Sequence, residues 1–327
     1  MKGDINNRDR KIQGLFYETS KQLSSVVDKT KDAIICPLCG TSFGFESLNK
    51  DLSIEHVPPR ATARLIGERS LTTITCARCN NHYGSELQGH LKAFLIFQLH
   101  QSGKYEKPLR GTMQMQDPSL VPLRANIVFT QDKVQVVGVP KANNIQDTQK
   151  HSQALNDLVH SQTKDWQFNV TLNYGFVLSK AWQALLHSAY LAAHIISGCS
   201  YAFTPAGTKL RELIAKDETA QLGPCVIVPQ TIGVGGNQWI ARINMPLDLR
   251  SLWVKVAGNI VILPMPSDDG LQCYNAWQRV SSITNFGLSP RIENLNITFF
   301  SERDGLEAQK CLPRFFAHAR PKGFESI

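Results

Sequence analysis

The stretch LSIEHVPPR, residues 52–60, places a carboxylate and an imidazole, Glu55 and His56, side by side before a Pro-Pro step and an arginine. Two Cys-x2-Cys pairs bracket it, CPLC at 36–39 and CARC at 76–79. A Glu-His dipeptide occurs by chance in many proteins, so its position between two cysteine pairs needs an explanation. The cysteine-bracketed segment is therefore the part of the chain that says most about fold and function.

The cysteine spacing predicts a tetrahedral site for a structural Zn²⁺ ion. The two-residue spacer lets both thiolates of a pair reach one ion, and Gly40 suits the tight turn that such a knuckle needs. A core of four reduced thiols does not explain the repeated spacing. The expected ligands are Cys36, Cys39, Cys76 and Cys79. The singly scattered cysteines are expected to be small buried side chains: Cys199, Cys225, Cys273 and Cys311.

The composition of the 327 residues, 42% hydrophobic and 19% charged, is that of a chain that buries an ordinary globular core. The N-terminus lacks the apolar region of a signal peptide, and the most apolar stretch, 181–196, is interrupted by polar residues. We therefore expect a cytoplasmic protein without a membrane span. Residues 60–110 hold eight basic and three acidic side chains, a clustering that a polyanion-binding site requires and that an ordinary solvated face also produces.

The order CPLC…LSIEHVPPR…LTTITCARCNN resembles the HNH, or ββα-metal, endonucleases, and specifically the subgroup whose ββα element is stapled by a four-cysteine zinc. The resemblance covers residues 34–90, about a fifth of the chain. It implies metal-dependent hydrolysis of DNA phosphodiester bonds, by nicking or by double-strand cutting. The architecture also resembles effectors of bacterial anti-phage defence systems, which implies protein partners in such a system.

The resemblance assigns roles by position. It makes His56 the general base that activates water and Glu55 a ligand of a catalytic Mg²⁺ or Mn²⁺. Asn80 takes the place of the ligand on the helix after the second cysteine pair, with His82 and Glu86 as alternatives. The chemistry agrees, since a neutral imidazole accepts a proton from water and a hard divalent cation stabilises charge at a phosphorus centre.

Two arginines are candidates for contact with the substrate phosphate, Arg60 after the Pro-Pro step and Arg78 within the second cysteine pair. The sequence also departs from the family pattern. The Asn that usually holds the base histidine is replaced by a stretch in which Thr72, Thr73 or a backbone carbonyl would have to do so. A non-catalytic zinc module that binds nucleic acid, and an endonuclease acting on RNA, are the alternative interpretations.

The predicted fold class is α+β, with a small zinc-stapled ββα-metal nuclease domain between flanking helices, followed by a larger α+β domain. Periodicity predicts helices near 8–33, 83–100, 147–163 and 178–198, and strands in 124–140 and 224–266. The expected divisions are an N-terminal amphipathic helix at 1–33, the nuclease domain at 34–102, a connector at 103–123 and a targeting or regulatory domain at 124–327.

Overall fold

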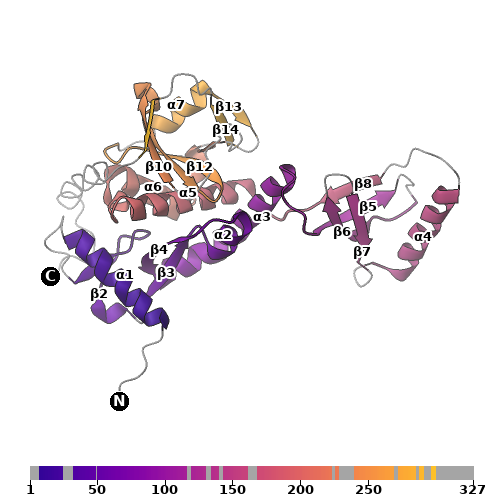
Figure 1. Ribbon diagram of the computed structural model, residues 1–327, viewed down its shortest axis with the longest axis horizontal. Helices are drawn as coiled ribbons and strands as arrows, with labels where there is room; N and C mark the ends of the chain where they lie inside the picture. The colour runs from indigo at the N-terminus through magenta and orange to yellow at the C-terminus, as the bar shows by residue number, and fades with distance from the viewer. Residues whose placement is uncertain are drawn as a thin grey trace, which may run out of the picture. The chain divides into compact units, whose positions relative to one another are not determined.

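An antiparallel hairpin of strands β3 (Leu52–Val57) and β4 (Leu71–Cys76) lies at the centre of the region that the sequence singles out (Figure 1). It belongs to a computed structural model of the chain. The structure describes residues 7–24, 32–48, 50–115, 119–129, 134–139, 143–160, 168–222, 225–227, 239–268, 272–284, 287–290 and 296–299. The contacts divide the chain into two compact units, residues 1–92 with 177–327, and residues 93–176.

In the first unit, the hairpin is followed directly by the long helix α3 (Ala77–Gln101), and a short helix α2 (Arg60–Ile66) joins its two strands. Helix α2 ends at Gly67, whose φ of 70° is the left-handed conformation that glycine adopts without strain. Upstream lie helix α1 (Asn7–Ser24) and the pair of strands β1 (Ala33–Ile35) and β2 (Ser42–Gly44). The order after residue 52 is therefore strand, helix, strand, helix.

The two faces of the hairpin are covered by different elements. Strand alternation puts Leu52, Ile54 and His56 on one face and Ser53, Glu55 and Val57 on the other. Helix α1 covers the first face through a cluster that shares Ile12, Phe16, Leu52 and Ile74. Helices α3 and α5 (Leu178–Ile196) cover the second face, as the hydrogen bonds and the cavity described below show.

Helix α5 is buried on nearly every side, with thirteen of its nineteen residues buried. It packs against the hairpin and also against strands of a seven-stranded sheet (Figure 1). An amphipathic stripe would serve one of these layers, whereas two layers require apolar residues around the whole helix. Every residue from Ala184 to Ala193 is buried, and all of them except His187, Ser188 and Tyr190 are Ala or Leu, which meets that requirement.

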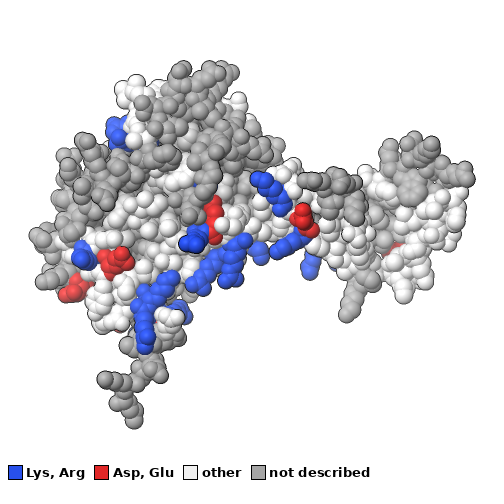
Figure 2. Space-filling model, in the orientation of Figure 1, with Lys and Arg blue, Asp and Glu red and all other residues white. Residues whose placement is uncertain are grey.

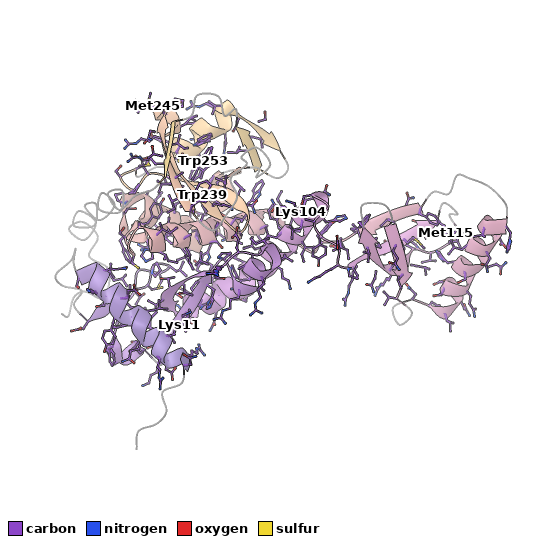
Figure 3. All side chains as sticks on the ribbon, viewed as in Figure 1. Lys11, Lys104, Met115, Trp239, Met245 and Trp253 are labelled. Atoms are coloured by element: carbon purple, nitrogen blue, oxygen red, sulfur yellow. The ribbon has the colours of Figure 1, made fainter. Side chains whose placement is uncertain are left out.

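The sheet has the strand order β13-β14-β9-β12-β11-β10-β15 and is largely antiparallel. Its strands are β9 (Val226–Ile227), β10 (Trp239–Met245), β11 (Ser251–Val256), β12 (Asn259–Leu263), β13 (Ser281–Thr284), β14 (Gly287–Pro290) and β15 (Asn296–Phe299). Trp253 of β11 and Trp277 of helix α7 (Gln272–Val280) pack together in its core, with ring centroids 5.5 Å apart (Figure 3). Helix α6 (Pro205–Ala215) is capped by Thr204, whose hydroxyl accepts a hydrogen bond from the Gly207 backbone N–H at 3.1 Å.

The second unit contains an antiparallel sheet in the order β7-β6-β5-β8 together with helix α4 (Ile145–His160). Its strands are β5 (Leu109–Met115), β6 (Leu123–Phe129), β7 (Val134–Gly138) and β8 (Phe168–Leu172). The second unit begins within α3 and ends just before α5, so in the sequence it lies between the two parts of the first unit.

The mixed α+β class is confirmed, but several predicted boundaries differ from the structure. Strand β5 lies within the predicted connector, because its pairing with β6 and β8 is a long-range contact that local periodicity does not show. The compact units do not follow the predicted divisions at 34–102 and 124–327, because α5 packs on the hairpin. The described helices α1 and α4 end at Ser24 and His160, and Cys311 lies outside the described residues.

No helix among the described residues combines the length and the apolar character that crossing a membrane requires.

We expect His194 of α5 to make the protein less stable in acid. Burial lowers the pKa of His194 from 6.5 to about 3, and its Nδ1 accepts a hydrogen bond from the Ala202 backbone N–H at 3.4 Å. Between these pKa values the unfolded chain binds a proton that the folded chain excludes, so stability falls as pH drops below about 6.5. By pH 5 the loss from this group is about 2 kcal/mol.

Urea unfolding at pH 7.5 and pH 5.0 measures this loss. His194→Gln should reduce the difference between the two pH values, while the same change at the exposed His160 should leave it intact. An unchanged pH dependence in the His194 variant would contradict this account of the buried imidazole.

Candidate catalytic and metal sites

The four predicted zinc ligands converge on one point. The Sγ atoms of Cys36, Cys39, Cys76 and Cys79 all lie within 4.8 Å of one another. The Cys39 and Cys76 Sγ atoms are 3.8 Å apart, which matches the separation of about 3.8 Å that tetrahedral zinc with Zn–S bonds of about 2.3 Å imposes. These four cysteines could therefore hold a metal ion such as zinc.

Hydrogen bonds connect the sulfur atoms of the cluster to one another and to the backbone. The backbone N–H groups of Cys76 and Cys79 each donate to a cluster sulfur, Cys36 Sγ and Cys76 Sγ respectively, at 3.4 Å. Hydrogen bonding from the Cys36 thiol lowers the pKa of Cys76 to about 7 and takes that of Cys39 far below its ordinary value, while hydrogen bonding within the cluster raises the pKa values of Cys36 and Cys79. Ionised sulfur is the form that binds zinc, so two of the four cysteines already favour the ligand state without an ion.

Residues distant in the sequence complete the cluster. The Tyr190 hydroxyl of α5 donates to the Pro37 carbonyl at 2.6 Å, inside the first knuckle. Gly40 has a φ of 73°, and the Arg211 guanidinium of α6 lies 3.5 Å from the position that a Cβ there would take. Arg211 and the exposed Arg78 line one groove beside Cys39 and Cys79. Their positive charge offsets the net negative charge of four thiolates around one divalent ion.

Glu55 points into the interior. It is 4% exposed and lines a small cavity of about 10 Å³ together with Tyr83 and Leu87 of α3 and His187 of α5. Burial raises the pKa of Glu55 to about 8 and lowers that of His187 to about 4, so both groups are uncharged at neutral pH. Among the described residues, neither Glu55 Oε2 nor His187 Nε2 has a hydrogen-bond partner.

His56 faces the opposite side of the hairpin. It lines an open groove of about 300 Å³ that is also lined by Lys11 of α1, Arg60 and Arg64 of α2, and Arg69. Its Nε2 atom is buried and has no hydrogen-bond partner among the described residues. Partial burial, followed by the charges of Arg60 and Lys11, lowers the pKa of His56, and a hydrogen bond with the Ile54 backbone opposes this shift. His56 is therefore neutral near pH 7, the state that a general base requires.

Asn80 joins the helix to the hairpin. Its side-chain amide donates to Ser53 Oγ at 2.8 Å and to the Ile54 carbonyl at 3.0 Å. The same Ile54 backbone interacts with the His56 ring. Asn80 thus fixes the strand segment that carries Glu55 and His56, and only its Oδ1 atom is left as a ligand oxygen.

Three of the residues expected as ligands of a catalytic Mg²⁺ or Mn²⁺ lie in different places. Glu55 lines the interior cavity, whereas His82 is exposed in the groove beside the four cysteines and Glu86 is exposed on α3. Within the described part of the chain, the only cluster of three or more His, Cys, Asp or Glu side chains that could share an ion is the four-cysteine one. Glu55 and His82 thus line separate hollows of the molecule.

The candidate phosphate contacts separate in the same way. Arg60 shares the groove of His56, while Arg78 lies beside the cysteine cluster. Thr72 stands opposite His56 in the strand register and lines the same groove, whereas Thr73 is buried opposite Glu55. Thr72 is thus the better placed of the two threonines to contact His56.

Sequence reasoning missed Lys11, Arg64, Arg69 and His187 as neighbours of the site. The four-residue spacing of Arg60 and Arg64 puts both on one side of a helix, a signal that the local sequence does contain. Lys11 and His187 reach the hairpin only through the packing of α1 and α5, which no local pattern reveals.

Comparisons of this chain with protein-family models, with curated proteins and with solved structures find no significant match.

We expect the purified protein to hold about one zinc ion per chain, and Cys76→Ser to lose it. Native mass spectrometry and a colorimetric zinc assay measure the metal content. Loss of the ion should also lower the melting temperature, because binding to a site formed only on folding stabilises the fold.

Cys225→Ala is the matched control, since Cys225 is buried but lies outside the cluster. A Cys76→Ser protein that retains zinc at the wild-type level would show that the four sulfur atoms are not the ligands.

Proposed function

We propose that this chain is a DNA endonuclease of the HNH type that hydrolyses phosphodiester bonds with the aid of Mg²⁺ or Mn²⁺. The observation that supports the proposal most strongly is the environment of His56. Its imidazole is neutral, its Nε2 has no partner, and it lies among the side chains of Lys11, Arg60, Arg64 and Arg69. A proton acceptor beside several cations is what hydrolysis of a phosphodiester requires.

In the proposed reaction, the phosphate lies in the groove with its oxygens toward Arg60 and its neighbours. The His56 imidazole accepts a proton from a water molecule as the water oxygen attacks phosphorus. The cationic side chains offset the charge that builds up on the phosphorane oxygens. The bond to the 3′-oxygen then breaks, and this oxygen takes a proton from solvent to leave a 3′-hydroxyl beside a 5′-phosphate. Zinc on the four cysteines would be structural, fixing the two ends of the segment that carries His56.

The divalent ion is supported by the resemblance alone, because Glu55 and His82, two of its expected ligands, line separate hollows. No step above is assigned to it. Omitting and restoring Mg²⁺ or Mn²⁺ in the cleavage assay tests the requirement directly.

A non-catalytic zinc module that binds nucleic acid is the second candidate. The observation in its favour is that Glu55 is buried and uncharged on the face of the hairpin opposite His56. Such a module would use the same basic groove but would leave the bound polymer intact. RNA incubated in a parallel reaction separates a DNA endonuclease from one that acts on RNA.

Supercoiled plasmid incubated with the zinc-loaded protein and Mg²⁺ or Mn²⁺ should be nicked or linearised. His56→Ala should slow cleavage by about 10²- to 10⁴-fold, the usual contribution of a general base. Gel analysis of the plasmid forms measures the rate. Zinc content and circular dichroism must match those of wild type.

His160→Ala, which alters an exposed histidine of α4, should cleave at the wild-type rate. Plasmid that is bound but not cut would favour the binding module. Cleavage that survives in His56→Ala would rule out His56 as the base.

The pH dependence of cleavage should reflect the lowered pKa of His56. Because the base acts in its deprotonated form, the rate should fall to half its plateau value at a pH below 6.5. Initial rates measured between pH 5 and pH 8, corrected for folded fraction, test this. A midpoint above pH 6.5 would contradict the assignment.

A further inference from the structure

The groove around His56 is built from three separate segments of the chain. Lys11 comes from α1, Arg60 and Arg64 come from α2, and Arg69 comes from the segment before β4. All four side chains are exposed at the surface, and the described residues provide no ion-pair partner for Lys11, Arg60 or Arg64. Figure 2 shows blue side chains gathered over the region of α1 and α2.

One carboxylate, Glu68, also lines the groove. Its Oε1 atom accepts a hydrogen bond from the Gly258 backbone N–H at 3.1 Å, so it is tied to the turn between β11 and β12. The four basic side chains outnumber this single carboxylate, so the groove carries a net positive charge. Such a surface binds the negatively charged backbone of a polymer.

The lining also indicates which form of the polymer fits. The groove is open, and none of the described residues that line it is Phe, Tyr or Trp. Proteins that bind single strands stack unpaired bases on aromatic rings, which the described lining does not provide. A duplex, whose bases are already stacked and whose phosphates face outward, requires only the cations.

We propose that α1 and α2 together form the binding track for a duplex DNA backbone, with Lys11 and Arg64 as phosphate-contact residues on either side of His56. The proposal rests on the proposed function for the position of the reacting phosphate, but not for the binding itself. It places the substrate on the α1 side of the hairpin, away from α3 and the zinc cluster. Lys11, which projects from α1 in Figure 3, lies outside the segment that resembles a nuclease.

Fluorescence anisotropy with a 20-base-pair DNA duplex tests the track. The His56→Ala protein, with zinc bound and no added Mg²⁺, serves as the parent so that cleavage cannot interfere. Lys11→Gln and Arg64→Gln should each reduce the slope of log affinity against log salt by about 0.9, and the double variant by about twice as much. Lys21→Gln, at an exposed position on the same α1, should leave slope and affinity unchanged.

A single-stranded 20-mer of the same sequence should bind more weakly than the duplex. Slopes that do not change in Lys11→Gln and Arg64→Gln, or tighter binding of the single strand, would overturn the proposal. Circular dichroism and zinc content confirm that each variant is folded.

The two proposals can fail separately. Loss of binding in the Lys11 and Arg64 variants, without plasmid cleavage by the unaltered protein, supports the track and removes the nuclease. Plasmid cleavage that depends on His56 but not on Lys11 or Arg64 supports the nuclease and removes the track.

Discussion

The convergence of four cysteine sulfur atoms within 4.8 Å is the constraint on which the rest of the candidate site depends. Cys36 and Cys39 flank the turn between β1 and β2, while Cys76 ends β4 and Cys79 lies in the first turn of α3. The contact between the two cysteine pairs brings the two ends of the segment 40–75 together. This segment contains β3, the strand that carries Glu55 and His56.

Helix α5 supplies the second constraint. Its apolar surface is buried on one side by the seven-stranded sheet and on the other by the hairpin, and its Tyr190 hydroxyl binds the first cysteine knuckle. The four-cysteine cluster and the seven-stranded sheet therefore both pack on α5. Asn80 adds a local link, since its amide holds the Ile54 carbonyl beside the two residues of interest.

Strand alternation decides which way Glu55 and His56 face. Neighbouring residues of β3 face opposite sides, so Glu55 is buried and uncharged under α3 and α5 while His56 opens to a basic groove. The burial of Glu55 beside His187 explains its raised pKa, because a carboxylate in that cavity would lose its hydration without gaining a partner. The chemistry that this arrangement supports is centred on His56 and its cationic neighbours.

The sequence by itself predicted the four-cysteine cluster, because two Cys-x2-Cys pairs are the pattern of residues that share one tetrahedral metal ion. It also determined the α+β class and the helical nature of α3 and α5, whose apolar periodicity spans many residues. Only the tertiary structure decided which side chains meet. Lys11 lines the same groove as His56, and His187 lines the same cavity as Glu55. Strand β5 likewise joins its sheet by pairing with segments far away in the chain. Such contacts depend on how whole elements pack, and a linear pattern carries no record of that.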